Sequence, residues 1–364
     1  MIPRATAVIA LALQAAPLAA PSIYATRFSQ KPANSPRVVS ARVRTGGQPG
    51  PGEAIGKFDS GRAWEHLRQM VAIGPRPSGS PAIEQTRKYI REQMTAIGLP
   101  PAEQIWDDQT PIDRVHLVNL VATIPGTRKE RIVFAGHYDT KLFREFRFVG
   151  ASDGGSSAAF LIELARVLKA RKNPFTVEIL FLDGEEARLP DWGGADNTYG
   201  SRHYVETAKR DGTLASIKSL VLVDMIGDRD LRIRRDTNST TWLTDMVWDA
   251  AKRLQFDSVF IETPTRVEDD HVPFLAAGVP SVDIIDLDYE PWHTAKDNLD
   301  AVSARSLQIV GDVVLGALPQ IEAHLGKGTV ATAKRLPGKG KSAVVANASN
   351  KKNRRARLLA KAGH

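Results

Sequence analysis

Apolar residues between about positions 58 and 326 follow two kinds of pattern. In residues 60–74 and 80–98 they recur every three or four positions, which predicts two amphipathic helices, the second ending at Gly98. Four shorter segments are almost continuously apolar and rich in Val, Ile, Leu and Phe. These segments are residues 131–139, 176–186, 219–227 and 281–288. Such runs are typical of strands that are buried on both faces of a parallel sheet.

Another helical pattern, over residues 156–170, lies between the first two of these strands and is typical of a crossover connection. The alternation of helices and buried strands predicts an α/β sandwich formed by one domain. Each predicted strand is followed by ionisable residues: His137 and Asp139; Asp183, Glu185 and Glu186; Asp224; Asp283 and Asp286. Because ligands bind beyond the carboxyl ends of strands in open α/β sheets, we expect these side chains to converge on one place.

Charge is distributed unevenly along the 364 residues. The formal net charge is +8, but residues 327–364 contain eleven Lys or Arg and no acidic residue, and residues 1–57 have a net charge of +6. The remaining segment, 58–326, is therefore acidic, with a net charge of −9. An acidic folded domain argues against nucleic-acid binding by that domain.

The two basic ends have different compositions. Residues 26–57 are rich in Pro, Gly, Ser and Arg, which predicts a flexible linker, and residues 327–364 are predicted to be a disordered basic tail. The tail is either simply solvated or adheres to anionic surfaces or nucleic acid. The folded domain is accordingly predicted to span residues 58–326.

The first 25 residues resemble a secretory signal peptide, with one Arg, an apolar stretch and Ala-rich cleavage sites. The apolar stretch, residues 5–20, is shorter than the roughly 20 residues that span a membrane, although an uncleaved anchor is the alternative. We therefore predict export to the periplasm or secretion, with no membrane span after cleavage. The chain contains no Cys, which excludes disulfides and thiolate chemistry.

Two adjacent glutamates, Glu185 and Glu186, follow the second apolar run. Two like charges at the end of a buried strand repel and lose solvation, unless a cation or a proton lies between them. Other ionisable residues occur in similar positions and complete the candidate set: His137, Asp139, Asp153, Asp224, Asp269, Asp270, His271 and His293. Histidine and carboxylate ligands without Cys suit Zn²⁺ in a catalytic site, where three protein ligands leave a position open.

Each candidate also has a purely structural interpretation. Asp153 precedes a predicted helix and would serve as its N-cap, a role that Ser152 could also fill. The glutamate pair would lie in a solvated loop, and His293 would be a histidine satisfied in the core. Asp224 would pair with backbone groups at the end of its strand.

Seven segments carry a family resemblance, in this order: HYDTK at 137–141, RFVGASDGGSSAAFLIELARVL at 147–168, FLDGEEA at 181–187, YGSRHYVE at 199–206, LVDMIG at 222–227, DDHVPFLAAGVP at 269–280 and WHT at 292–294. Together they resemble glutaminyl cyclase, a relative of the zinc-dependent aminopeptidases, over roughly residues 60–318. The resemblance implies a three-layer α/β sandwich with a mixed, mostly parallel central sheet. It also implies that N-terminal glutamine of peptides or proteins is converted to pyroglutamate with release of ammonia.

The resemblance also implies roles for individual residues. Zinc would be held by Asp153, Glu186 and His293. Glu185 would be the general acid and base. Asp269 and Asp224 would complete a hydrogen-bonded acidic network, and Trp292 and Trp192 would line the substrate pocket. We expect a monomer.

One position departs from the animal cyclases, which have a His a few residues after the GVP motif where this chain has Asp283. His137 and Asp224 match the positions that hold a second zinc in the aminopeptidases. An exported aminopeptidase with two zinc ions, in which Glu185 activates water, is therefore the alternative enzyme. A non-catalytic binding domain on a peptidase-like scaffold is a third possibility, disfavoured because every expected ligand is present.

Overall fold

The computed structural model describes the backbone of residues 56–333 and the side chains of residues 56–327. The predicted signal peptide (1–25) and nearly all of the predicted linker (26–57) and tail (327–364) lie outside the described residues. Helix α7 (Ala304–Ala333) continues past the predicted domain boundary at residue 326. No helix within residues 56–333 combines the length and the apolar character needed to cross a membrane.

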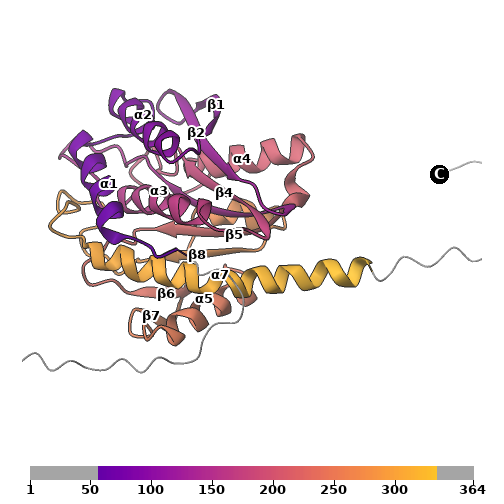
Figure 1. Ribbon diagram of the computed structural model, residues 1–364. Coiled ribbons are helices and arrows are strands. Elements are labelled where there is room, and N and C mark those ends of the chain that lie inside the picture. Colours follow the sequence, from indigo (N-terminus) through magenta and orange to yellow (C-terminus); the bar gives the residue numbers. More distant parts are fainter. Residues whose placement is uncertain (1–55, 334–364) are drawn as a thin grey trace, which may run out of the picture. The chain divides into compact units, whose positions relative to one another are not determined.

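A six-stranded sheet forms the centre of the domain (Figure 1). Its order is β1 (Ala102–Gln109), β2 (Arg114–Ile124), β4 (Phe175–Leu182), β3 (Arg128–His137), β5 (Ile217–Asp224) and β8 (Ser281–Ile285). Strands β4, β3, β5 and β8 pair in parallel, whereas β2 is antiparallel to both of its neighbours. The sheet is therefore mixed and mostly parallel, as predicted.

Both faces of the sheet are covered by helices, which explains why the central strands are apolar throughout. Alternate side chains of β3 point to opposite faces: Phe134 joins one core, and Val133 and Ala135 join the other. The first core is closed by α1 (Ser60–Ile73), α2 (Pro81–Ala96), α3 (Gly155–Lys169), α5 (Thr241–Arg253) and α7. The second is closed by α4 (Tyr199–Arg210) and α6 (His271–Ala276). The predicted three-layer α/β sandwich is confirmed.

The predicted helices at 60–74, 80–98 and 156–170 correspond to α1, α2 and α3. Gly98 follows the end of α2 with a positive φ of 72°, a backbone conformation that glycine adopts without strain. The pattern did not predict β1 and β2, nor a separate pair of short parallel strands, β6 (Ile233–Asp236) and β7 (Phe260–Thr265), nor the 3₁₀ turn at Leu214–Ser216.

Asp183, directly after β4, belongs to neither cluster of potential metal ligands and shares the Ser78 hydroxyl with Asp139. Its carboxylate forms a fully buried ion pair with Arg87 of α2 and accepts hydrogen bonds from the Ser78 hydroxyl (2.7 Å) and the Val118 amide (2.9 Å). The pair joins the end of β4 to α2 and thereby holds the start of the Gly184–Glu186 segment. The expectation that every strand-end carboxylate converges on one site is therefore wrong for Asp183, because side chains alternate in direction along a strand.

Candidate functional site

Four connections at the carboxyl edge of the sheet carry the candidate site. His137 ends β3, Glu185 and Glu186 follow β4, and Asp224 ends β5. Asp153 lies in the turn before α3, and His293 lies in the loop that follows β8. Because four of these strands run in parallel, their ends lie on the same edge of the sheet.

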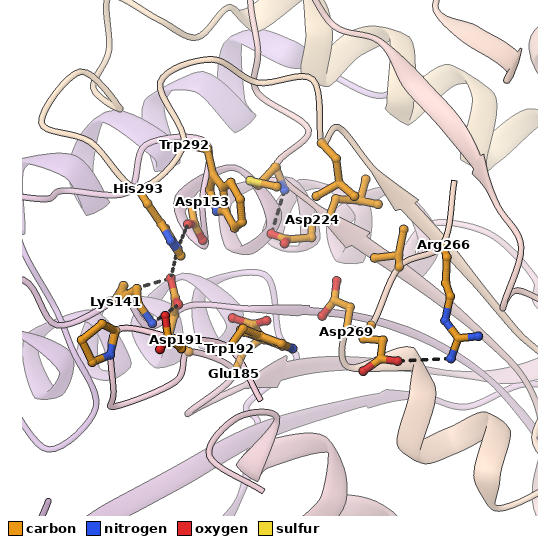
Figure 2. Close-up of a pocket in the computed structure, with 17 residues that line it drawn as sticks. Lys141, Asp153, Glu185, Asp191, Trp192, Asp224, Arg266, Asp269, Trp292 and His293 are labelled. Carbon is orange, nitrogen blue, oxygen red and sulfur yellow. Dashed lines mark hydrogen bonds and ion pairs between the residues drawn. The ribbon is translucent and has the colours of Figure 1, made fainter. Parts of the chain in front are cut away.

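Asp153, Glu186 and His293 form one cluster of potential metal ligands, whose donor atoms all lie within 4.8 Å of one another. His293 Nε2 is 3.3 Å from Asp153 Oδ2 and 3.3 Å from Glu186 Oε1. Figure 2 shows the His293 and Asp153 side chains directed toward each other across the cavity. The three residues are therefore placed together as the resemblance implied.

His137, Asp153 and Asp224 form a second cluster of the same kind. His137 Nε2 is 3.2 Å from Asp153 Oδ1 and 3.0 Å from Asp224 Oδ1. Asp153 thus faces His293 with one carboxylate oxygen and His137 with the other. A single aspartate joins the two clusters.

The structural interpretations fit these residues less well. The N-cap of α3 is Gly154, and no side chain caps the helix, so Asp153 is not its cap. Glu185 and Glu186 are buried, with exposures of 6% and 4%, rather than solvated. Asp224 does accept a hydrogen bond from the Met225 amide (2.7 Å), as a strand-end aspartate would, but it also pairs with His137.

The donor set also fits a metal on energetic grounds. Among the described residues, Asp153 Oδ2 and Glu186 Oε2 are buried oxygens without a hydrogen-bond partner. Leaving buried carboxylate oxygens without a hydrogen bond is costly, and a bound cation would reduce that cost. Two carboxylates and one histidine are ligands that zinc accepts in catalytic sites.

Backbone conformation around the ligands is unusual. His293 has a φ of 53°, and Met225, next to Asp224, has a φ of 46°. Non-glycine residues with such values are strained, and this strain is concentrated at functional sites. Gly154 has a φ of 73°, and a Cβ there would lie 2.3 Å from the Asp139 carbonyl oxygen and 3.0 Å from His137 Cε1. Only glycine therefore lets the Asp153 turn approach His137.

Burial and the mutual repulsion of carboxylates dominate the electrostatics. Burial, followed by repulsion from Asp153, raises the pKa of Glu186 to about 7. Burial, together with repulsion from Glu186, raises the pKa of Glu185 well above its usual range, although the charge of His137 opposes the shift. Burial alone would lower the pKa of His293, but the neighbouring carboxylates of Asp153 and Glu186 raise it to about 9. The site therefore holds excess negative charge that attracts cations and protons.

Glu185 lies beside the clusters without belonging to either. Its Oε2 atom is 3.8 Å from His137 Nδ1. The Asp139 carboxylate accepts hydrogen bonds from the backbone amides of Glu185 (3.3 Å) and Glu186 (3.4 Å), which fixes the turn that carries both. The Glu185 carboxylate therefore lies next to the two clusters without being a member of either.

A cavity of about 500 Å³ opens onto these groups, within the range typical of small-molecule sites. Glu185, Glu186, Asp153 and His293 line it, and the half-exposed indoles of Trp192 and Trp292 form part of its wall (Figure 2). His137 does not line it and lies buried behind Asp153.

The acidic network expected from the resemblance differs in detail. Asp224 and Asp269 both line the cavity, but within the described part of the chain no hydrogen bond joins Glu185, Asp224 and Asp269. Asp224 pairs with His137 instead, and Asp269 Oδ2 has no partner. Two carboxylates can hydrogen-bond to each other only through a proton, and burial, with repulsion from Asp224, raises the pKa of Asp269 to about 7.

Asp270, His271 and Asp283 lie behind the cavity instead of lining it. His271 is fully buried between two carboxylates: its Nε2 is 3.1 Å from Asp236 Oδ2 and its Nδ1 is 3.5 Å from Asp283 Oδ2. Asp283 does not extend either ligand cluster. The additional carboxylate at this position is therefore a partner of His271 rather than a further metal ligand.

Sequence reasoning assigned no role to two residues that support the site. Lys141 is buried, lines the cavity, and its Nζ is 3.8 Å from Glu186 Oε2. Asp297 is fully buried and accepts hydrogen bonds from the amides of Ser152 (2.8 Å) and Asp153 (3.2 Å) and from the Tyr289 hydroxyl (2.6 Å). Lys141 ends the quoted segment 137–141 and Asp297 follows the quoted segment 292–294, but an ionisable residue in a loop carries no signal of its own.

We expect Asp297→Asn to weaken zinc binding about 10- to 100-fold, as is typical when a residue that supports a metal ligand is altered. An amide accepts hydrogen bonds at only one of its two heavy atoms, so the Ser152–Asp153 turn would lose an anchor. Competition with a chelating dye would measure the change. Asp300→Asn, at an exposed residue of the same loop, is the matched control. Equal zinc affinities in all three proteins would contradict the anchoring role.

Comparison with known proteins agrees with this geometry. Residues 119–318 match peptidase family M28. A glutaminyl-peptide cyclotransferase of Drosophila melanogaster is 30% identical over 266 residues, covering 65% of this chain and 75% of that protein. A glutaminyl-peptide cyclotransferase-like protein of Bos taurus is 30% identical over 275 residues, covering 67% and 71%. The crystal structure of an Acidobacteriales bacterium glutaminyl cyclase superposes with a TM-score of 0.72 at 38% identity, covering 76% of this chain and all of that one.

The family match covers more than half of the chain and includes most of the α/β sandwich and the clustered ligands described above. The chain therefore belongs to peptidase family M28. Within that class it belongs with the glutaminyl-peptide cyclotransferases, as the relatives of 30% and 38% identity indicate. The resemblance stated from the sequence is thereby confirmed.

Proposed function

We propose that this protein is a zinc-dependent glutaminyl-peptide cyclotransferase. It would convert the N-terminal glutamine of peptides or proteins to pyroglutamate and release ammonia. The observation that carries the proposal is the placement of Asp153, Glu186 and His293 around one point of a cavity, with the Glu185 carboxylate beside them and outside the cluster. The names of the relatives support the same activity.

Asp153, Glu186 and His293 would hold the zinc ion. When bound, the ion supplies a Lewis acid for the side-chain carbonyl of the substrate glutamine. The buried oxygens of Asp153 and Glu186 that lack a hydrogen bond support this assignment. The second cluster, through His137 and Asp224, offers a place for a second ion, so one or two ions per chain are compatible with the donor set.

Glu185 would move the protons of the reaction. The α-amine of the substrate attacks the carbonyl carbon of its own side chain and must lose a proton, and the leaving nitrogen must gain one. One carboxylate performs both transfers in turn if its pKa lies closer to neutrality than that of an exposed glutamate. Burial and neighbouring carboxylates raise the pKa of Glu185 in this direction.

The cavity walls would favour ring closure. The indoles of Trp192 and Trp292 line the cavity and would displace water from around the bound glutamine. Confining the first residue between these walls would hold its amine close to its side-chain carbonyl, so that the two groups react from a fixed orientation. The reaction needs no water as a nucleophile, so exclusion of water also suppresses hydrolysis.

The exported zinc aminopeptidase is the second candidate, because one observation favours it. Asp153 belongs to both ligand clusters, so the chain would offer ligands for two metal ions, a number that hydrolytic sites often use. In that enzyme Glu185 would take a proton from an attacking water molecule.

Purified zinc-loaded protein should separate these two activities. We expect ammonia release and pyroglutamate formation from a Gln-initiated peptide, and no free leucine from a Leu-initiated peptide of the same length. Removing zinc with a chelator should abolish turnover, and adding zinc back should restore it. Release of leucine without ring closure would establish the aminopeptidase instead, and the ratio of zinc to protein would decide between one ion and two.

Export and a monomeric state stay predictions from the sequence. The proposed reaction requires a peptide or protein whose first residue is glutamine and involves no atom of the residues that follow.

A further inference from the structure

A second cavity adjoins the one that contains the candidate site. It has a volume of about 380 Å³ and is lined mainly by residues of α4, of α6 and of the loop before α4. Trp192, Glu268 and Asp269 line both cavities. The two spaces are therefore adjacent.

The floor of this second cavity is apolar, and its rim is charged. Val205 of α4 and Val272, Pro273 and Ala276 of α6 supply the apolar surface. Glu206 and Lys209 are exposed at the rim. This composition suits a peptide, whose apolar side chains can contact the floor while its backbone stays partly solvated.

Arg202 of α4 lines the same space but is already engaged. Its guanidinium donates hydrogen bonds to the carbonyl oxygens of Ala195 (2.7 Å) and Asn197 (2.8 Å) and lies over the Tyr199 ring. The Arg202 guanidinium therefore stabilises the loop before α4 and is not available to bind an acidic ligand.

We propose that the second cavity binds the residues that follow the N-terminal glutamine of a peptide substrate, and that it favours apolar side chains at those positions. This inference rests on the proposed function. The α-amine and side chain of the first residue must stay beside Glu185, so the rest of the peptide has to leave the first cavity. An extended chain advances roughly 3.3–3.6 Å per residue. The residues after the first would therefore pass Trp192, Glu268 and Asp269, which line both cavities, and enter the adjoining space.

Ala276→Arg tests the proposal by filling the floor of the second cavity. Ala276 is an exposed residue at the last position of α6, where arginine is a good helix former and its charge is favourable. We compare a Gln-Gly dipeptide with a hexapeptide that begins Gln-Leu-Val. For the variant we expect kcat/KM to fall about tenfold with the hexapeptide, the effect of losing one apolar contact, and to stay within about twofold with the dipeptide.

Ala96→Arg is the matched control. Ala96 is an exposed residue at the end of α2, a helix that packs on the opposite face of the sheet, and the substitution should change neither rate. If Ala276→Arg lowered kcat/KM equally for the dipeptide and the hexapeptide, the substitution would have damaged the catalytic cavity, and the proposal would be overturned. Unchanged rates with both would overturn it as well.

A binding measurement keeps this test separate from the proposed reaction. A hexapeptide that begins with norvaline in place of glutamine has no side-chain amide and cannot cyclise. Calorimetric titration should give a Kd about tenfold weaker for Ala276→Arg than for the unaltered protein. An equal Kd for both proteins would overturn the subsite, whereas a protein that binds this peptide but cyclises no glutamine peptide would overturn only the proposed reaction.

Discussion

Glu185→Gln should lower kcat for cyclisation about 10²- to 10⁴-fold, the usual contribution of a general acid and base. Glutamine has nearly the same shape as glutamate but cannot take up and return a proton. The backbone amide at position 185 still donates to Asp139, so the turn is retained. Because Glu185 belongs to neither ligand cluster, zinc content should stay close to that of the unaltered protein.

The measurement combines steady-state kinetics with elemental analysis of the same protein preparation. Glu290→Gln is the control, since Glu290 is exposed and lies in the loop before His293. A Glu185→Gln protein with full zinc and undiminished turnover would show that another group transfers the protons. Loss of zinc together with activity would show that Glu185 is a ligand.

His293→Ala should lose zinc and turnover together. The histidine contributes one of the three donors of the first cluster. Altering a residue that only supports a ligand weakens metal binding by up to about 100-fold, and we expect the loss of a ligand to weaken zinc binding more than that. Because metal binding contributes to the free energy of folding, the melting temperature of the zinc-loaded protein should fall as well.

Chelation separates this effect from a loss of packing. After zinc removal, the difference in melting temperature between the unaltered protein and His293→Ala should shrink to the part that comes from the ion pairs of His293 with Asp153 and Glu186. His116→Ala, at an exposed histidine on β2, should bind zinc normally. Full zinc occupancy in His293→Ala would remove His293 from the ligand set.

The sequence predicted the parallel part of the fold because burial on both faces leaves a strong signal. The β3, β4, β5 and β8 segments are apolar at consecutive positions, since helices cover both sides of the sheet. Strand β1 lacks this signal: at the sheet edge its residues are only exposed or partly buried. The composition of β1 therefore does not reveal that it pairs with β2.

The sequence predicted where the site lies but not which side chains contact one another there. Ionisable residues after several buried strands indicated a common edge, and the family resemblance selected Asp153, Glu186 and His293 among them. Nothing in the local sequence indicates that the two oxygens of Asp153 face different histidines, or that Asp183 pairs with Arg87. These details depend on side-chain directions that are set only when the strands pack.

The distribution of the ligands over the chain has a consequence for the order of events during synthesis. His137, Asp153 and Glu186 leave the ribosome early, whereas His293 follows β8, the last strand added to the sheet. The first cluster is complete only when this late segment has docked against the others. Zinc retention would therefore distinguish fully assembled molecules from nascent or truncated chains, which makes the metal a convenient reporter of finished folding.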